Sequence, residues 1–197
     1  MSWRAEGLAI WAFAVRSLVM GIRNIFFLFE LLFWPVVGTL SIGLMTRFLH
    51  LGAAETSFVL IGTIALSTVQ VCQLEVSYAV LYDVWSKSVK HQFVAPIGVR
   101  HMMLGSWLIG ILRGLVVFVL LAALSRWAFG FDVLAGGAGA LLIFLTGCFL
   151  TALVIGIFVC VLILTFGNRA EASAWATVNL VLVLAGIYYP VSVLPQP

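Results

Sequence analysis

Five stretches of mostly apolar residues run through the sequence, and each is long enough to cross a lipid bilayer as a helix. They cover residues 25–49, 57–85, 101–124, 133–166 and 172–189. A hydrocarbon layer of about 30 Å needs a helix of about 20 residues, and lipid offers no hydrogen-bond partner to open backbone. The alternating segments of a membrane β-barrel are absent from the sequence. We therefore predict an all-α, polytopic membrane protein with a single domain over residues 1–197.

The scarcity of charge excludes the soluble classes of protein. Hydrophobic residues make up 64% of the chain and charged residues 9%, whereas soluble domains use about 25% charged residues. The ten Lys and Arg residues are scattered singly, so the net charge of +3 does not indicate a nucleic-acid partner. Cys72, Cys148 and Cys160 lie in apolar runs without a CxxC motif or a cluster with histidine. We interpret them as buried apolar residues and expect this chain to bind no metal or cofactor.

The N-terminal residues have the pattern of an amphipathic helix. An apolar stripe at the spacing i, i+3, i+4, i+7 includes Trp11 and is flanked by Arg16 and Arg23. We predict that residues 2–24 form a helix that lies in the headgroup layer of the membrane. A first membrane span over residues 8–20 is the alternative, although that run is short for the hydrocarbon layer and contains Arg16.

The Lys and Arg residues between the spans predict the orientation. With the N-terminus in the cytoplasm, seven of them lie on the inner side and two on the outer side. The inner residues are Arg4, Arg16, Arg23, Lys87, Lys90, Arg100 and Arg169, and the outer residues are Arg47 and Arg126. We therefore expect a multi-pass protein of the plasma membrane, in bacteria the inner membrane, with a cytoplasmic N-terminus.

A few polar residues inside the predicted spans are candidates for function. An ionised carboxylate in hydrocarbon requires a partner, water or a proton. Glu75 has two interpretations: a packing partner or counter-ion of Arg113, or part of a substrate route together with Gln70 and Gln73. Glu30 lies near the cytoplasmic boundary, where an interfacial ion pair is the simpler interpretation.

Small residues and one proline predict how the spans pack. Gly110 and Gly114 form a GxxxG pair, which lets helix backbones approach closely. We expect this pair to pack within the chain rather than to form a dimer face. Pro35 is expected to kink the first span.

The segment 86–96 connects the second span to the third on the cytoplasmic side. Its polar first half contains Lys87 and Lys90, and Phe93 and Pro96 follow. This order predicts a short amphipathic helix that lies along the membrane and ends at the proline. A solvated loop is the alternative.

The order of these features resembles the membrane subunit of ABC-2-type exporters over essentially the whole chain. In that family an amphipathic helix precedes the first span, and a coupling helix ends in a proline ahead of a Leu-Gly pair. A hairpin after the fifth span carries Gly, Tyr-Pro and Leu-Pro. The matching residues are Pro96 with Leu104-Gly105, the loop Asn168-Arg169-Ala170-Glu171 with Trp175, Gly186, Tyr189-Pro190 and Leu194-Pro195.

The resemblance assigns roles to two groups of residues. The coupling helix over 86–96 would contact an ATPase through Lys87, Val89, Lys90, Phe93 and Pro96. The outer hairpin would begin over 190–197 and include Tyr189, Pro190, Leu194 and Pro195. Because family members continue into a sixth span, we expect the sequence to be a fragment or a truncated product.

The resemblance also implies a function. The chain would be a permease subunit, not an enzyme, that exports a hydrophobic, lipid-linked or drug-like substrate. The sequence contains no GxxxxGK[ST] phosphate-binding loop, so ATP and Mg²⁺ are expected on a separate ATPase subunit. The implied assembly has two ATPase subunits and two permeases, the second being another copy of this chain or a paralogue. ATP-driven closure would move the coupling helix and tilt the first, second and fifth spans.

Two other classes of function stay open from the sequence. A secondary carrier or channel would use Glu75, Gln70 and Gln73, but such carriers are built from inverted repeats, and no convincing repeat is found. A non-transporting membrane scaffold is the other alternative, and it would not co-purify with an ATPase.

Overall fold

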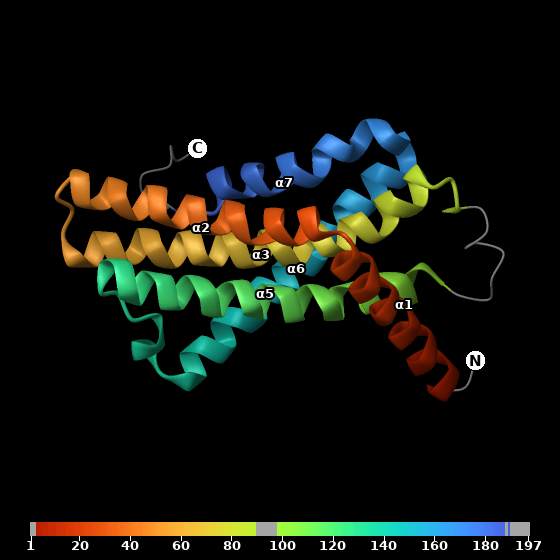
Figure 1. Cartoon of the computed structure of the whole chain (residues 1–197), viewed down its shortest axis with the longest axis horizontal. Coiled ribbons are helices and arrows are strands. Elements are labelled where there is room, and N and C mark those ends of the chain that lie inside the picture. The colour runs from red at the N-terminus through yellow and green to blue at the C-terminus, as the bar shows by residue number, and fades with distance from the viewer. Residues whose placement is uncertain (1–2, 90–97, 188, 190–197) are drawn as a thin grey trace, which may run out of the picture.

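The computed structural model describes residues 3–89, 98–187 and 189 of the chain (Figure 1). Its long helices are α1 Trp3–Arg23, α2 Ile25–Phe48, α3 Ala53–Trp85, α5 Val99–Phe129, α6 Ala138–Phe166 and α7 Glu171–Leu184. Two short 3₁₀ helices, η1 Val133–Gly136 and η2 Gly167–Ala170, precede α6 and α7. Within these described ranges the structure contains no strand, so the predicted all-α class is confirmed.

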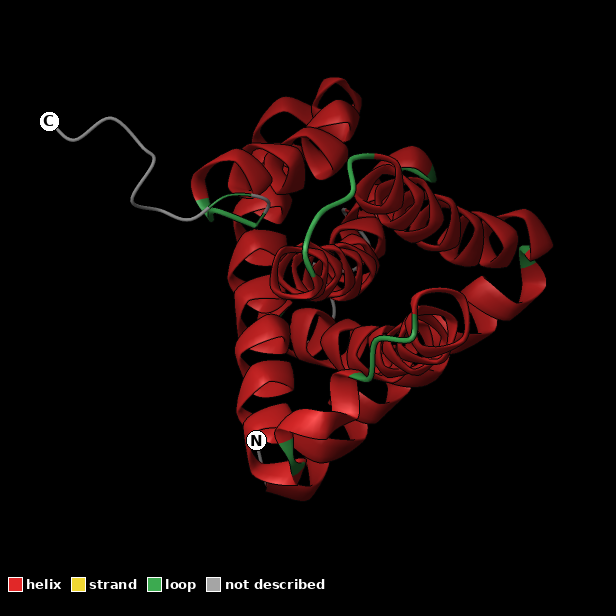
Figure 2. Ribbon diagram, turned by 90° about the vertical axis from the view of Figure 1, so that its left-hand side faces the viewer, coloured by secondary structure: helices red, strands yellow, loops and turns green. Residues whose placement is uncertain are grey.

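The central element of the bundle is α3. It packs against α2, α5, α6 and α7, and most of its residues from Leu60 to Asp83 are buried. In Figure 1, α2, α3 and α5 run side by side along the long axis, whereas α1 is inclined to them and crosses α5. Figure 2 looks down that axis and shows the helices joined by short loops at their ends.

Close helix contacts occur at glycines. A Cβ atom added to Gly110 would lie 2.9 Å from the Cys72 carbonyl oxygen of α3. One added to Gly114 would lie 2.8 Å from the Phe149 ring of α6. The GxxxG pair therefore packs within the chain, as predicted. At Gly105, α5 approaches the α1 backbone, where an added Cβ would lie 2.6 Å from the Ile10 carbonyl oxygen.

Among the described residues, five helices have the length and composition of membrane spans: α1, α2, α3, α5 and α6. The sequence also predicted five spans, but the two sets of five are not the same. The helix α1, predicted to lie in the headgroup layer, also meets these criteria, whereas α7 covers 14 residues and ends at Leu184. Multiple crossings of a membrane are supported, and the headgroup position of residues 2–24 stays a prediction.

Some helix boundaries differ by several residues from the predicted span boundaries. The predicted fourth span over 133–166 begins as η1, and α6 starts only at Ala138. The cause is Gly137, which has a φ of +84° and turns the chain between the two helices. The helix α3 begins four residues before the predicted residue 57, and α5 extends to Phe129. Pro35 lies inside α2, which continues through it as one helix.

Candidate functional site

A group of charged and polar side chains lies where α1 crosses α3 and α5. We call it the polar junction, and it consists of Arg16, Ser17, Glu75, Asp83, Ser106 and Arg113. All of these residues lie in long apolar helices, where unpaired polar groups are strongly unfavourable. The hydrogen bonds among them therefore decide how the three helices are held together.

The deepest contact in the polar junction is the ion pair of Glu75 on α3 with Arg113 on α5. Their side chains are 6% and 8% exposed. The second guanidinium nitrogen of Arg113 also donates to the carbonyl oxygen of Ser17 on α1, at 3.4 Å. Glu75 is thus the counter-ion of Arg113, and Arg113 joins all three helices.

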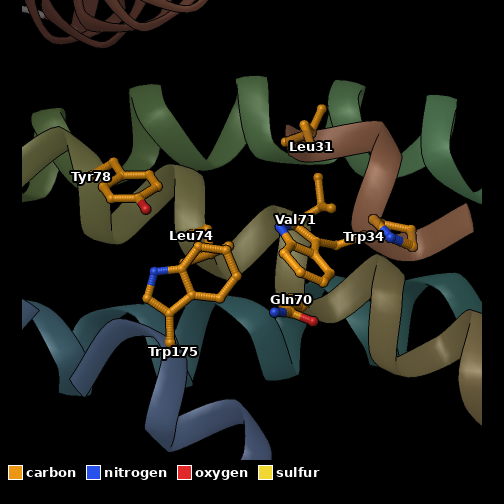
Figure 3. A pocket seen from close by; sticks show the side chains of 8 residues that line it. Leu31, Trp34, Gln70, Val71, Leu74, Tyr78 and Trp175 are labelled. Atoms are coloured by element: carbon orange, nitrogen blue, oxygen red, sulfur yellow. The ribbon is translucent and has the colours of Figure 1, made fainter. Parts of the chain in front are cut away.

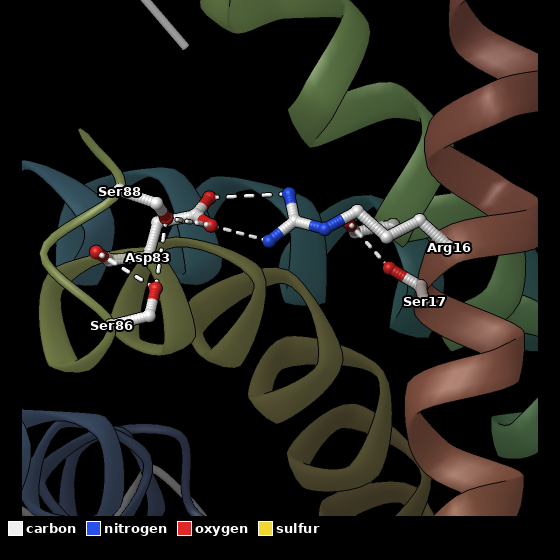
Figure 4. A network of polar contacts seen from close by, with 6 residues as sticks. Arg16, Ser17, Asp83, Ser86 and Ser88 are labelled. Atoms are coloured by element: carbon white, nitrogen blue, oxygen red, sulfur yellow. Dashed lines mark hydrogen bonds and ion pairs between the residues drawn. The ribbon is translucent and has the colours of Figure 1, made fainter. Parts of the chain in front are cut away.

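A second ion pair connects α1 to the last turn of α3. Arg16 Nη1 donates to Asp83 Oδ2 at 3.2 Å, and Arg16 Nη2 contacts the other carboxylate oxygen. Figure 4 shows the guanidinium reaching across from α1 to the carboxylate. Because the Asp83 side chain is 4% exposed, this charge depends on Arg16 for compensation.

Asp83 also holds the start of the segment that follows α3. Ser88 Oγ donates to Asp83 Oδ1 at 3.0 Å, and the Ser88 backbone N–H donates to the Asp83 carbonyl oxygen at 3.0 Å. Ser86 and Ser88 are hydrogen-bonded through their hydroxyls at 2.8 Å. Between them Lys87 has a φ of +56°, which folds the chain back over the end of α3. One carboxylate therefore binds α1 and the segment beginning at residue 86.

The contact of α1 with α5 is completed by two further polar pairs. The hydroxyls of Ser17 and Ser106 lie 3.1 Å apart and are buried. Nearer the start of both helices, Arg100 Nη2 lies 2.6 Å from Glu6 Oε1. Side chains of the polar junction, among them Arg16, Glu75 and Arg113, border a hollow of about 10 Å³, about large enough for one water molecule.

A second candidate site is a hollow of about 30 Å³ between α2, α3 and α7. Figure 3 shows that it is bordered by Trp34 of α2, Gln70 and Leu74 of α3, and Trp175 of α7. The two indole rings give it mainly apolar walls, and the Gln70 amide and the Tyr78 side chain with its hydroxyl also border it. Such a site suits an amphiphilic ligand more than a charged one.

The three residues proposed for a substrate route do not meet at one place. Gln70 lines the hollow between α2, α3 and α7. Gln73 is fully buried and its Nε2 donates to Ser77 Oγ at 2.7 Å within α3. Glu75 points to α5 and pairs with Arg113.

The interface-helix residues differ in exposure and in their contacts. Trp11 and Arg23 are exposed, as are most members of the predicted apolar stripe. Arg16 instead points to α3 and binds Asp83. Asp83, Ser17 and Ser106 were not predicted as site residues from the sequence. For Asp83 a signal existed, because its charge is opposite to that of Arg16 and both residues are predicted near the cytoplasmic side.

The coupling and hairpin residues are only partly covered by the structure. Lys87 is exposed and Val89 is half-buried, and Tyr189 is half-buried at the other end of the chain. The remaining predicted residues lie outside the described residues: Lys90, Phe93, Pro96, Pro190, Leu194 and Pro195. The backbone of Glu30 is helical, but its side chain is likewise outside the description. Among the residues that are described, no group of three or more His, Cys, Asp or Glu side chains is placed to hold a metal ion.

Comparison with known proteins gives one family and one relative. The sequence model of the ABC-2 type transporter family matches residues 9–197. An uncharacterized protein of Archaeoglobus fulgidus is 43% identical over 42 residues. That alignment covers 21% of this chain and 66% of the relative, so the chain spans just under two thirds of that protein's length. No solved structure matches the chain.

Proposed function

We propose that this chain, which belongs to the ABC-2 type transporter family, exports a hydrophobic or amphiphilic substrate. As a member of that family, the chain is the permease component of an ATP-binding cassette transporter and not an enzyme. The energy comes from a separate ATPase that binds ATP and Mg²⁺ and seats on residues 86–96. The working complex contains two ATPase subunits and a second permease, which is another copy of this chain or a paralogue.

The observation that carries this proposal is the position of Asp83. It lies in the last turn of α3, directly before the proposed coupling segment, and it binds both Ser88 of that segment and Arg16 of α1. A displacement of the segment would pull on α3 through the chain and on α1 through the ion pair. Ser17 and Arg113 then extend the connection from α1 to α5. Helices linked in this way move as rigid bodies, which is how domain closure is transmitted in switching proteins.

The hollow lined by Trp34, Gln70 and Trp175 is the proposed entry to the substrate route. Its volume of about 30 Å³ is far below the several hundred Å³ that a drug-sized ligand occupies. Transport therefore requires α2 and α7 to move relative to α3, opening the hollow toward the second permease. The aromatic walls select for apolar or amphiphilic substrates, and Gln70 supplies one hydrogen-bonding group.

The arrangement gives the secondary-carrier alternative no support. That mechanism needs Glu75, Gln70 and Gln73 along one path, whereas each of the three faces a different neighbour. Glu75 in particular is engaged by Arg113.

The proposal is tested by recovering the ATPase. Tagged full-length chain is purified from native membranes in mild detergent, and co-purifying proteins are identified by mass spectrometry. We expect an ATPase with a phosphate-binding loop, and we expect Val89→Asp to abolish its recovery, because the substitution places a charge on the proposed docking surface.

Ala172→Asp is the matched control, since it adds the same charge at an exposed position in the first turn of α7, next to the cytoplasmic connection predicted from the sequence. It should leave recovery unchanged, and size-exclusion profiles confirm that both variants are folded. Failure to recover any ATPase with the unmodified chain contradicts the permease assembly. Equal recovery with Val89→Asp contradicts the docking role of residues 86–96.

A further inference from the structure

A cavity of about 230 Å³ lies between α5 and η1, at the opposite end of the bundle from the proposed coupling segment. It is larger than the two hollows described above and shares no residue with them. The lining side chains are mainly apolar: Phe118, Val119, Ala122, Ala123 and Leu134, with Arg126 and Asp132 at one side.

The chain geometry at the end of α5 creates this cavity. Gly130 and Gly137 both have positive φ angles, of 71° and 84°, and they turn the chain away from α5 before α6 begins. In Figure 1 the first turns of α6 swing away from α5 on this side. Because Ala122 and Ala123 have small side chains, the space between the diverging elements is not filled.

Polar contacts fix the wall of the cavity. Asp132 Oδ1 accepts a hydrogen bond from the Leu134 backbone N–H at 2.9 Å and so caps η1. Its other carboxylate oxygen lies 3.3 Å from Arg126 Nη1. The cap fixes the shape of η1, which forms one wall of the cavity, and the exposed ion pair lies at the edge of the cavity.

The surroundings of the cavity favour hydrocarbon as its occupant. α5 has the composition of a membrane span, and side chains such as Val119 face outward beside the opening. An apolar cavity of roughly 150 Å³ stays dry and binds a molecule the size of benzene, so a larger one accommodates part of an acyl chain. Water would find polar partners only at the side of Arg126 and Asp132.

The edge of the cavity carries a group suited to a phosphate. The Arg126 side chain is 70% exposed, and guanidinium groups bind phosphate oxygens through paired hydrogen bonds. The neighbouring Trp127 is also exposed, as expected for an aromatic residue at headgroup depth. A cation beside an apolar cavity at the end of a span matches the chemistry of an anionic lipid.

We propose that this cavity binds an anionic phospholipid of the surrounding membrane. One acyl chain lies between Val119, Ala123 and Leu134, and the phosphate is held by Arg126. The site is separate from the hollow at Gln70, and its occupancy does not depend on the proposed transport function. The bound lipid fills the space between α5 and η1 and keeps the start of α6 separated from α5.

The test uses photoactivatable lipid on purified full-length chain in detergent micelles. The probe is phosphatidylglycerol with a diazirine in one acyl chain, and labelled peptides are mapped by mass spectrometry. We expect adducts concentrated on the peptides that contain Val119, Ala123 and Leu134, and we expect unlabelled phosphatidylglycerol to compete for them. Ala123→Phe, which fills the cavity, should reduce this labelling several-fold.

Val116→Phe is the matched control. Val116 is 54% exposed on the same helix but does not line the cavity, so the same change should leave the labelling unaltered. Arg126→Gln tests the phosphate contact and leaves the cavity unfilled. It should weaken labelling by phosphatidylglycerol several-fold and leave labelling by a diacylglycerol with the same diazirine chain, which lacks the phosphate, nearly unchanged.

Several outcomes would overturn the proposal. Labelling that is spread evenly along the exposed face of α5, and is not reduced by competitor, would indicate bulk lipid. Unchanged labelling in both Ala123→Phe and Arg126→Gln would show that the cavity is not a lipid-binding site. Absence of lipid adducts together with crosslinks between two copies of the chain at these residues would assign the cavity to a protein interface instead.

Discussion

The ion pair between Arg16 and Asp83 provides the sharpest prediction about how the helices are joined. Two unit charges about 4 Å apart attract by about 4 kcal/mol at an effective dielectric constant near 20. Burial of Asp83, which is 4% exposed, offsets more than half of that attraction, whereas Arg16, at 28% exposed, keeps part of its hydration. We therefore expect a net coupling energy of about 1–2 kcal/mol between the two side chains.

A double-mutant cycle measures this coupling energy. The variants are Arg16→Gln, Asp83→Asn and the double variant, and the assay is thermal unfolding of the purified chain in detergent micelles. Asparagine is chosen because its side-chain oxygen can still accept the hydrogen bond from Ser88. The pair of Arg100 with Glu6 serves as the control cycle, because these side chains are 67% and 34% exposed and should couple by less than about 0.5 kcal/mol.

The reasoning fails if the two substitutions are simply additive. A coupling energy below about 0.3 kcal/mol, as found for independent sites, would mean that the contact does not hold α1 to α3. The same conclusion would follow if the exposed control pair coupled as strongly as Arg16 with Asp83.

Three further predictions concern other contacts. Replacing Glu75 by Gln leaves the Arg113 charge unpaired in the core and should destabilise the chain by about 3–5 kcal/mol, whereas Glu75→Leu combined with Arg113→Met should be far less harmful. Thermal unfolding of both variants checks this, and equal losses would contradict it. Gly110→Ala should lower the unfolding temperature because the added Cβ meets the α3 backbone, while Gly139→Ala, with nothing within 4 Å, should leave it unchanged or raise it. If both substitutions behave alike, the close approach at Gly110 is wrong. Gln70→Ala should raise the substrate concentration needed for half-maximal stimulation of the partner ATPase without changing its maximal rate. A lower maximal rate at unchanged half-saturation would place Gln70 outside the substrate route.

The helices themselves were largely predictable from the sequence, since in lipid an apolar run of sufficient length has no stable alternative to a helix. The division of the predicted fourth span was missed. Gly136 and Gly137 form a Gly-Gly pair, which is a turn signal, but the apolar residues on both sides made the run read as one continuous span. The end of α7 at Leu184 was missed for the same reason, as the apolar run continues beyond it.

The candidate site was predictable only where sequence spacing determined it. Five residues along a helix correspond to a rotation of about 140° from the nearest full turn, so this spacing alone places Gln70 and Glu75 on different faces of α3. The structure agrees, since Gln70 lies toward Trp34 and Trp175 and Glu75 toward Arg113.

The link between Arg16 and Asp83 could not be predicted from spacing. These residues are separated by 67 positions, and their contact depends on the angle at which α1 crosses α3 and α5. The helices α1 and α5 pack closely at Gly105, and the Leu104-Gly105 pair of the family pattern does not indicate which helix this glycine contacts. Most of the apolar stripe of α1 is exposed in the structure, but hydropathy gave no information on what the opposite face of this helix binds.

The central claim is that movement of the coupling segment reaches the membrane helices through Asp83. Its most direct test is a charge swap in the complex of the chain with its co-purified ATPase, reconstituted in proteoliposomes. We predict that Arg16→Asp and Asp83→Arg each abolish stimulation of ATP hydrolysis by the permease, and that the double swap restores a substantial part of it. Full stimulation in either single variant, or no recovery in a double swap that folds and retains its ATPase, would contradict the account.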